Sequence, residues 1–112
     1  MPQSTEIPPE TLHRWIGDGE AVLVDVREAN EVASARLAEA VHLPMSAFDA
    51  DRIPTATGKK VVFICAAGLR SEQVRQYVVS QGILDEAYNL AGGLKAWTQA
   101  GLPLETGPLS PP

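Results

Sequence analysis

The sequence predicts an α/β domain built on a mainly parallel β-sheet. Residues 61–64 are a short apolar run, and residues 21–26 are apolar on both faces apart from Asp25, as expected of strands that are buried on both faces of a parallel sheet. Segments with helical spacing separate the strands, and this alternation is typical of α/β architecture. With 112 residues, of which 45% are apolar, the chain is long enough to form one hydrophobic core. We therefore expect one domain over residues 1–106 and a loose tail at 107–112.

Local signals place the elements along the chain. Pro9 suits the first turn of a helix, which Gly17 should end, and Gly82 suits the position just after a helix. Residues 101–105 should leave the core. The elements expected in order are an edge strand at 4–7, a helix from 8, a central strand at 21–26, a short helix at 30–37, a strand at 40–44, helical turns within 45–52, a surface connection at 54–60, a strand at 61–64, a helix at 71–81, a strand at 87–90 and a helix that contains Leu94 and Trp97.

Composition and charge argue against several classes of function. The net charge is −5 and the basic residues are scattered, so we expect neither a nucleic acid nor a membrane as partner. No apolar run approaches the ~20 residues of a membrane span, and the polar N-terminus lacks the features of a signal peptide. The single cysteine rules out a multi-cysteine metal site, and His13 and His42 lack metal-ligand spacing, so no metal is expected. A free thiol persists in a reducing compartment, which predicts a cytoplasmic location.

The chemistry centres on Cys65, the only cysteine, which follows the apolar strand at 61–64. The thiolate is the reactive form of cysteine, whereas a free thiol has a pKa of about 8.5. The small residues at 66–68 would let successive amides turn inward as an anion-binding nest, and the helix from Ser71 would add its dipole. Arg70 would add a fixed positive charge. The alternative is that Cys65 is a small buried apolar residue at a strand end.

Asp25 and Arg27 lie at the end of the strand predicted at 21–26. Ligands of parallel sheets bind beyond the carboxyl ends of the strands, so this pair should share an edge of the sheet with Cys65. The two residues could form a catalytic pair. We interpret them instead as structural groups that fix neighbouring loops, because buried charges need partners.

The length of the loop narrows the chemistry. Cysteine-based phosphatases have a cradle for a phosphoryl group in which five residues separate Cys from Arg. Four residues separate Cys65 from Arg70, so this loop is one residue shorter. The terminal sulfur of a persulfide is smaller than a phosphoryl group and suits the tighter ring. The loop therefore favours sulfur transfer over the alternatives of a cysteine phosphatase or an arsenate reductase.

The chain resembles single-domain rhodanese-like, or thiosulfate sulfurtransferase-like, proteins over about residues 9–104. Three segments carry the resemblance: Leu-Val-Asp-Val-Arg-Glu at 23–28 with Glu31, Cys-Ala-Ala-Gly-Leu-Arg-Ser at 65–71, and Leu-Ala-Gly-Gly-Leu-Lys-Ala-Trp at 90–97 with Gly-Leu-Pro at 101–103. They occur in the order that the family shows. Residues 35–40 depart from the usual Gly-His-Ile-Pro-Gly-Ala pattern, and Ala66 stands where many thiosulfate-active members carry a basic or polar residue.

The resemblance implies a sheet of about five strands with helices on both faces. It also implies a sulfurtransferase that needs no cofactor beyond a covalent persulfide on Cys65. Cys65 would take sulfane sulfur from a donor such as thiosulfate and pass it to cyanide, a small thiol or a protein thiol. Backbone amides would hold the persulfide, Arg70 would attract an anionic donor, and the chain would be a monomer or a homodimer. The residues expected to form this cradle are Ala66, Ala67, Gly68, Leu69 and Arg70.

A second hypothesis is a non-catalytic module that uses the same scaffold to bind or regulate a partner. The acidic net charge, Ala66 and the departures at 35–40 motivate it. The presence of Cys65 and Arg70 argues against it, because degenerate members of the family commonly lose the cysteine.

Overall fold

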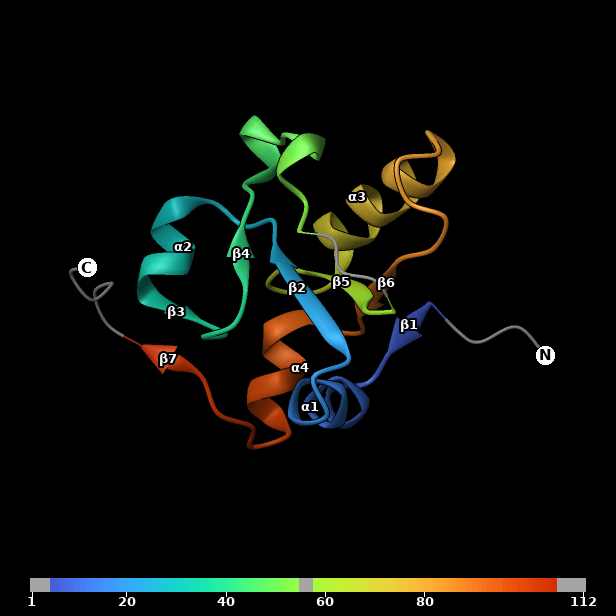
Figure 1. Ribbon diagram of the computed structural model, residues 1–112. Coiled ribbons are helices and arrows are strands. Elements are labelled where there is room, and N and C mark those ends of the chain that lie inside the picture. Colours follow the sequence, from blue (N-terminus) through green and yellow to red (C-terminus); the bar gives the residue numbers. More distant parts are fainter. Residues whose placement is uncertain (1–4, 55–57, 107–112) are drawn as a thin grey trace.

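A computed structural model describes residues 5–54 and 58–106 (Figure 1). At its centre is a five-stranded sheet in the order β1-β6-β5-β2-β4, in which every pair of neighbours is parallel. The strands are β1 (Glu6–Ile7), β2 (Ala21–Asp25), β4 (Val41–His42), β5 (Lys60–Ile64) and β6 (Tyr88–Leu90). The predicted α/β fold, its edge strand at the N-terminus and its central strand after residue 20 are confirmed.

Helices cover both faces of the sheet. Figure 1 shows α1 and α4 together on one side and α3 on the other. The helices are α1 (Pro9–Gly17), α2 (Ala29–Ser34), α3 (Leu69–Ser80) and α4 (Gly93–Gln99), and two 3₁₀ turns, η1 (Met45–Ala47) and η2 (Ala50–Arg52), follow β4. The helix predicted at 71–81 thus begins two residues earlier and ends one residue earlier, with the positive-φ Gly82 just beyond it.

The side chains of β5 alternate between two hydrophobic clusters. Val62 and Ile64 pack with residues of α1 and α4, whereas Val61, Phe63 and Cys65 pack with residues of α3. Both faces of this strand are buried, which explains why its sequence is apolar without interruption. The alternation also directs Cys65 toward α3.

The short helix predicted at 30–37 is wrong in its second half. Helix α2 ends at Ser34, and β3 (Ala35–Arg36) follows in extended conformation and pairs antiparallel with β7 (Glu105–Thr106). Arg36 turns its guanidinium back so that Nη1 donates to the Val32 carbonyl at 3.2 Å, which satisfies a group left free where α2 ends. Residues 101–105 leave the core as expected, since none of them is buried, and Glu105 begins the exposed strand β7.

Some of the predicted features lie outside the described residues. These are the first residue of the edge strand predicted at 4–7, the middle of the connection at 54–60 and the tail at 107–112.

Candidate active site

The carboxyl ends of β2 and β5 meet at one edge of the sheet. Asp25 and Ile64 are register partners, so Arg27 and Cys65 each follow a strand that ends at this edge. The predicted placement of these residues on a common edge is confirmed. The site is built from the connections that leave these two strands.

The loop from Cys65 to Gly68 turns the chain from β5 into α3. Gly68 has a φ of 96°, and its amide N donates to Cys65 Sγ at 3.0 Å. A Cβ on Gly68 would lie 3.1 Å from the amide N of Gly92. Glycine is required here by the left-handed backbone and by the close approach of a second segment.

Helix α4 fixes the opposite side of this loop. The amides of Leu94 and Lys95 donate to the carbonyls of Cys65 and Ala66 at 2.9 and 3.0 Å. At Gly93, which has a φ of 63°, a Cβ would lie 2.5 Å from the Cys65 carbonyl oxygen. The loop carbonyls are therefore bound by α4, while the Gly68 amide faces the sulfur.

The environment of Cys65 favours the thiolate. The residue is 1% exposed, and this burial raises the pKa of the thiol. Hydrogen bonds outweigh burial: the Ser71 hydroxyl and the amides of Ser71, Gly68 and Ala67 hold the pKa of Cys65 below its ordinary value. The hydroxyl lies 3.2 Å from Sγ. A buried sulfur that is surrounded by donors is suited to carry negative charge.

Arg70 lies beside the loop but is paired with an acid. Its Nη1 and Nη2 donate to the two carboxylate oxygens of Glu31 at 2.7 and 2.8 Å. The hydrogen bonds from Arg70 lower the pKa of Glu31 to about 2, and those to Glu31 raise the pKa of Arg70. Arg70 interacts electrostatically with Cys65, and the negative charge of its partner Glu31 opposes this effect.

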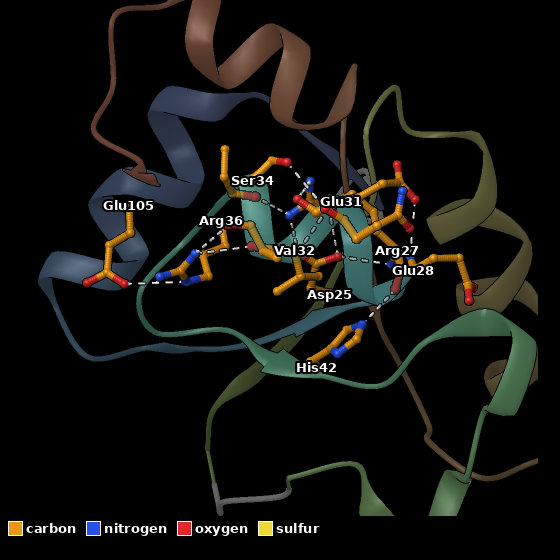
Figure 2. A network of polar contacts seen from close by, with 12 residues as sticks. Asp25, Arg27, Glu28, Glu31, Val32, Ser34, Arg36, His42 and Glu105 are labelled. Atoms are coloured by element: carbon orange, nitrogen blue, oxygen red, sulfur yellow. Dashed lines mark hydrogen bonds and ion pairs between the residues drawn. The ribbon is translucent and has the colours of Figure 1, made fainter. Parts of the chain in front are cut away.

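Asp25 and Arg27 form a buried ion pair that joins several elements (Figure 2). Arg27 donates from Nε to Asp25 Oδ1 at 3.0 Å and from Nη2 to Asp25 Oδ2 at 2.8 Å. Its Nη2 also reaches the Ala35 carbonyl at 2.6 Å, and the His42 ring N lies 2.7 Å from the Arg27 carbonyl. Arg27 Nη1 also donates to the Glu31 carbonyl in α2 at 3.4 Å. These contacts tie the end of β2 to α2, β3 and β4, which supports the structural interpretation of the pair.

Two site residues were missed by sequence reasoning. Ser71 and Asn89 are both 0% exposed, and the Ser71 hydroxyl lies within hydrogen-bond distance of both Cys65 Sγ and Asn89 Oδ1. The sequence analysis placed Ser71 at the start of a helix and at the end of the segment 65–71, and Asn89 within a strand, but it gave neither residue a role in the site. A signal for Asn89 was available, because it is a polar residue between Tyr88 and Leu90 in a short strand, and a buried polar group needs a partner.

The described residues contain neither a cluster of metal ligands nor a helix that could span a membrane. Within residues 5–54 and 58–106, no group of three or more His, Cys, Asp or Glu side chains could hold a metal ion. None of the helices described is long and apolar enough to cross a membrane.

The structure is an α/β domain with a five-stranded parallel sheet and, at one edge of that sheet, a buried thiol that accepts hydrogen bonds from backbone amides. Comparison with known families identifies the class. The model of the rhodanese-like domain family matches residues 8–100, so the chain belongs to this family.

Individual relatives agree with this assignment. The chain is 33% identical over 102 residues to a protein named thiosulfate sulfurtransferase GlpE from Actinobacillus succinogenes, a match that covers 91% of each chain. The chain is also 38% identical over 97 residues to an uncharacterized protein of Synechocystis. This match covers 87% of the chain and 54% of the Synechocystis protein, so the chain spans about half of that relative. The crystal structure of a rhodanese-related protein from Thermoplasma volcanium matches with a TM-score of 0.78 and 27% identity, covering 91% of this chain and 98% of that one.

Proposed function

We propose that the chain is a sulfurtransferase that carries sulfane sulfur on Cys65 as a persulfide. The observation that carries the proposal is the setting of the thiol: Sγ is buried, yet it lies against the Gly68 amide and the Ser71 hydroxyl. These donors stabilise the thiolate, which is the nucleophile in sulfur transfer. The likeness to a protein named thiosulfate sulfurtransferase supports the same chemistry.

The reaction has two halves. In the first, the Cys65 thiolate attacks the outer sulfur of a donor such as thiosulfate. The new S–S bond forms while the bond from that sulfur to the sulfonate sulfur breaks, and sulfite leaves with the electron pair. In the second half, cyanide or a thiolate attacks the outer sulfur of the persulfide, and Cys65 leaves as a thiolate. The chain has no second cysteine, so an acceptor thiol comes from another molecule.

The residues around Cys65 serve both halves. The Gly68 amide and the Ser71 hydroxyl stabilise the anionic sulfur as it attacks and again as it leaves. The amides from Ala66 to Arg70 form the cradle for the carried sulfur. The charge of Arg70, offset by Glu31, attracts an anionic donor to the mouth of the loop.

The test is the uptake and release of sulfur. We expect the intact mass to rise by one sulfur atom after incubation with thiosulfate or another sulfane donor, and cyanide to remove that sulfur as thiocyanate. The Cys65→Ser variant, checked for folding by circular dichroism, should show no gain. The absence of any gain with a panel of sulfane donors would overturn the proposal, and turnover of an aryl phosphate or of arsenate would point to the phosphatase or arsenate reductase chemistry instead. A Cys65→Ala variant that keeps the full biological function would indicate a binding module.

A further inference from the structure

Ser71 and Asn89 form a buried polar cluster behind the thiol. Ser71 lies on the inner face of α3, one and two turns before the buried residues Val74 and Val78. Asn89 lies between Tyr88 and Leu90, whose side chains join the cluster under α1 and α4. Because side chains alternate along a strand, Asn89 points to the other face of the sheet, toward α3. The two polar side chains meet there, and the Ser71 hydroxyl also reaches Cys65 Sγ at 3.2 Å.

The orientation of the Asn89 amide is fixed by two acceptors. Its Nδ2 donates to Glu6 Oε2 at 2.7 Å and to the Gly68 carbonyl at 3.0 Å. A flipped amide would place its oxygen against both of these oxygens and lose both hydrogen bonds. Asn89 Oδ1 therefore faces Ser71 as an acceptor.

The Ser71 hydroxyl has one proton and two neighbours that can accept it. A serine hydroxyl donates one hydrogen bond and can accept others. While Cys65 is a thiol, its S–H can donate to Ser71 Oγ, and the hydroxyl proton is free to bind Asn89 Oδ1. Once Cys65 is a thiolate, Sγ has no proton to donate and is the stronger acceptor because it is charged.

We propose that Ser71 is a catalytic residue whose hydroxyl proton turns from Asn89 Oδ1 to Cys65 Sγ when the thiol ionises, and that Asn89 is the positioning residue that limits this turn. The thiol proton leaves to solvent, and no covalent bond of Ser71 breaks. The role in sulfur transfer rests on the proposed function, because Cys65 becomes a thiolate before it attacks the donor and again when it releases the sulfur. Asn89 opposes the thiolate by competing for the same proton.

The charged groups near the cluster come from α3 itself and from other elements. They are Arg70 with its partner Glu31, the Asp25–Arg27 pair, and Glu6, whose carboxylate accepts from Asn89. Substitution of Ser71 leaves all of these charges in place. A change in the titration of Cys65 would therefore report the loss of the hydroxyl.

The first experiment titrates Cys65 without any sulfur donor, by thiolate absorbance and by the rate of alkylation as a function of pH. The chain has one cysteine, so both signals have a single source. A hydrogen bond to a charged group has a free energy that corresponds to a shift of about 1–2 pKa units. We expect Ser71→Ala to raise the pKa of Cys65 by that amount and Ser71→Thr to restore most of the shift. Ser80→Ala is the matched control, because this exposed serine on the same helix donates only to the Tyr77 carbonyl. An unchanged pKa in Ser71→Ala would overturn the proposal.

The second experiment is a double-mutant cycle that isolates the competition. Asn89→Leu removes the acceptor at nearly constant size, and it also releases the Gly68 carbonyl and Glu6. That release occurs with or without Ser71 and cancels in the cycle. We compare the shift in the Cys65 pKa that Asn89→Leu causes with Ser71 present and in the Ser71→Ala background. The shift should be more negative with Ser71 present, because the loss of Asn89 Oδ1 frees the Ser71 hydroxyl to donate to Cys65 Sγ, and the Ser71→Ala background has no hydroxyl to free. Equal changes in the two backgrounds would overturn the role of Asn89, and Asn89→Ala gives the same comparison if the leucine variant does not fold. Neither experiment uses a sulfur donor, so a failure of sulfur transfer and a failure of this inference are distinguishable.

Discussion

Arg70 forms an ion pair with Glu31, so both charges determine the electrostatic potential at the Cys65 loop. The two side chains share a bidentate contact at 2.7 and 2.8 Å, and each is partly exposed. Glu31 Oε1 also accepts from the Glu28 amide at 3.1 Å, as part of the capping box at the start of α2. The acid is thus held in place by its own helix. If Arg70 attracts the donor as proposed, its contribution should be smaller than that of an unpaired arginine at the same position.

This pairing predicts opposite effects for the two partners on the use of an anionic donor. We expect Arg70→Ala to raise the KM for thiosulfate by roughly fivefold, about 1 kcal/mol, and to affect a neutral organic trisulfide much less. Glu31→Gln should lower the KM for thiosulfate, because it leaves the arginine uncompensated. Arg70→Lys is the control that keeps the charge. Equal losses with the anionic and the neutral donor in Arg70→Ala would remove Arg70 from donor binding.

At the scale of elements, the packing of α4 on the Cys65 loop explains the Gly92-Gly93 pair. The two glycines have φ values of 72° and 63°, and the second lies directly against the loop backbone. This contact lets the amides of Leu94 and Lys95 bind the carbonyls of the loop. The first turn of α4 therefore shapes the side of the loop that faces away from the sulfur.

Gly93→Ala should disturb both folding and the thiol. The added Cβ would lie 2.5 Å from the Cys65 carbonyl oxygen in a left-handed backbone. We expect a loss of roughly 2–4 kcal/mol in the free energy of unfolding measured with urea, from the backbone strain and the clash together, and a changed rate of Cys65 alkylation. Gly101→Ala is the matched control: its φ is 76°, but nothing lies within 4 Å of an added Cβ. Gly101→Ala should lose only about 1 kcal/mol and keep the alkylation rate. Similar results for the two variants would contradict a specific contact with the loop.

The sequence predicts the long elements and the position of Cys65 at a strand end better than it predicts the short strands and the polar contacts. Strand β5 is a continuous apolar run after Lys60 and helix α3 ends just before Gly82, and both lie within two residues of the expected bounds. The edge of the sheet that carries Cys65 also lies where expected. The pairing of β3 with β7 was missed because two-residue strands have no period to detect. The Ser71–Asn89 contact was missed because it joins residues from different elements, and only the sheet order and the inner face of α3 bring them together.

At the scale of the whole molecule, contacts between distant parts of the chain assemble the site. The Asn89–Glu6 hydrogen bond spans 83 residues and links β6 to the edge strand β1. The Arg70–Glu31 pair spans 39 residues and links α3 to α2. The environment of Cys65 therefore depends on the complete fold. Stability and site geometry should respond together when one of these links is broken.

The pH dependence of unfolding tests the link between α2 and α3. Arg70 lowers the pKa of Glu31 from 4.5 to about 2 in the folded chain. At pH values between about 2 and 4.5, Glu31 is therefore protonated to a greater extent in the unfolded chain than in the folded chain. The resulting stabilisation is fully present above the unfolded-state value of 4.5 and is lost as the pH falls toward 2. Because the pair is partly exposed, we expect Glu31→Gln to reduce the free energy of unfolding by only about 1 kcal/mol at neutral pH.

The difference between the wild type and Glu31→Gln should narrow as the pH is lowered below the unfolded-state pKa of 4.5, since protonation removes the same charge that the substitution removes. Urea unfolding at a series of pH values measures this directly. In the Arg70→Ala background, Glu31→Gln should have little effect at any of these pH values, because the partner that lowers the pKa is absent. Parallel stability curves for the wild type and Glu31→Gln would show that the pair does not stabilise the fold through its charge. If the stability curves with and without Glu31→Gln converge at low pH only when Arg70 is present, the loss of stability in acid is due to the Arg70–Glu31 contact between α2 and α3.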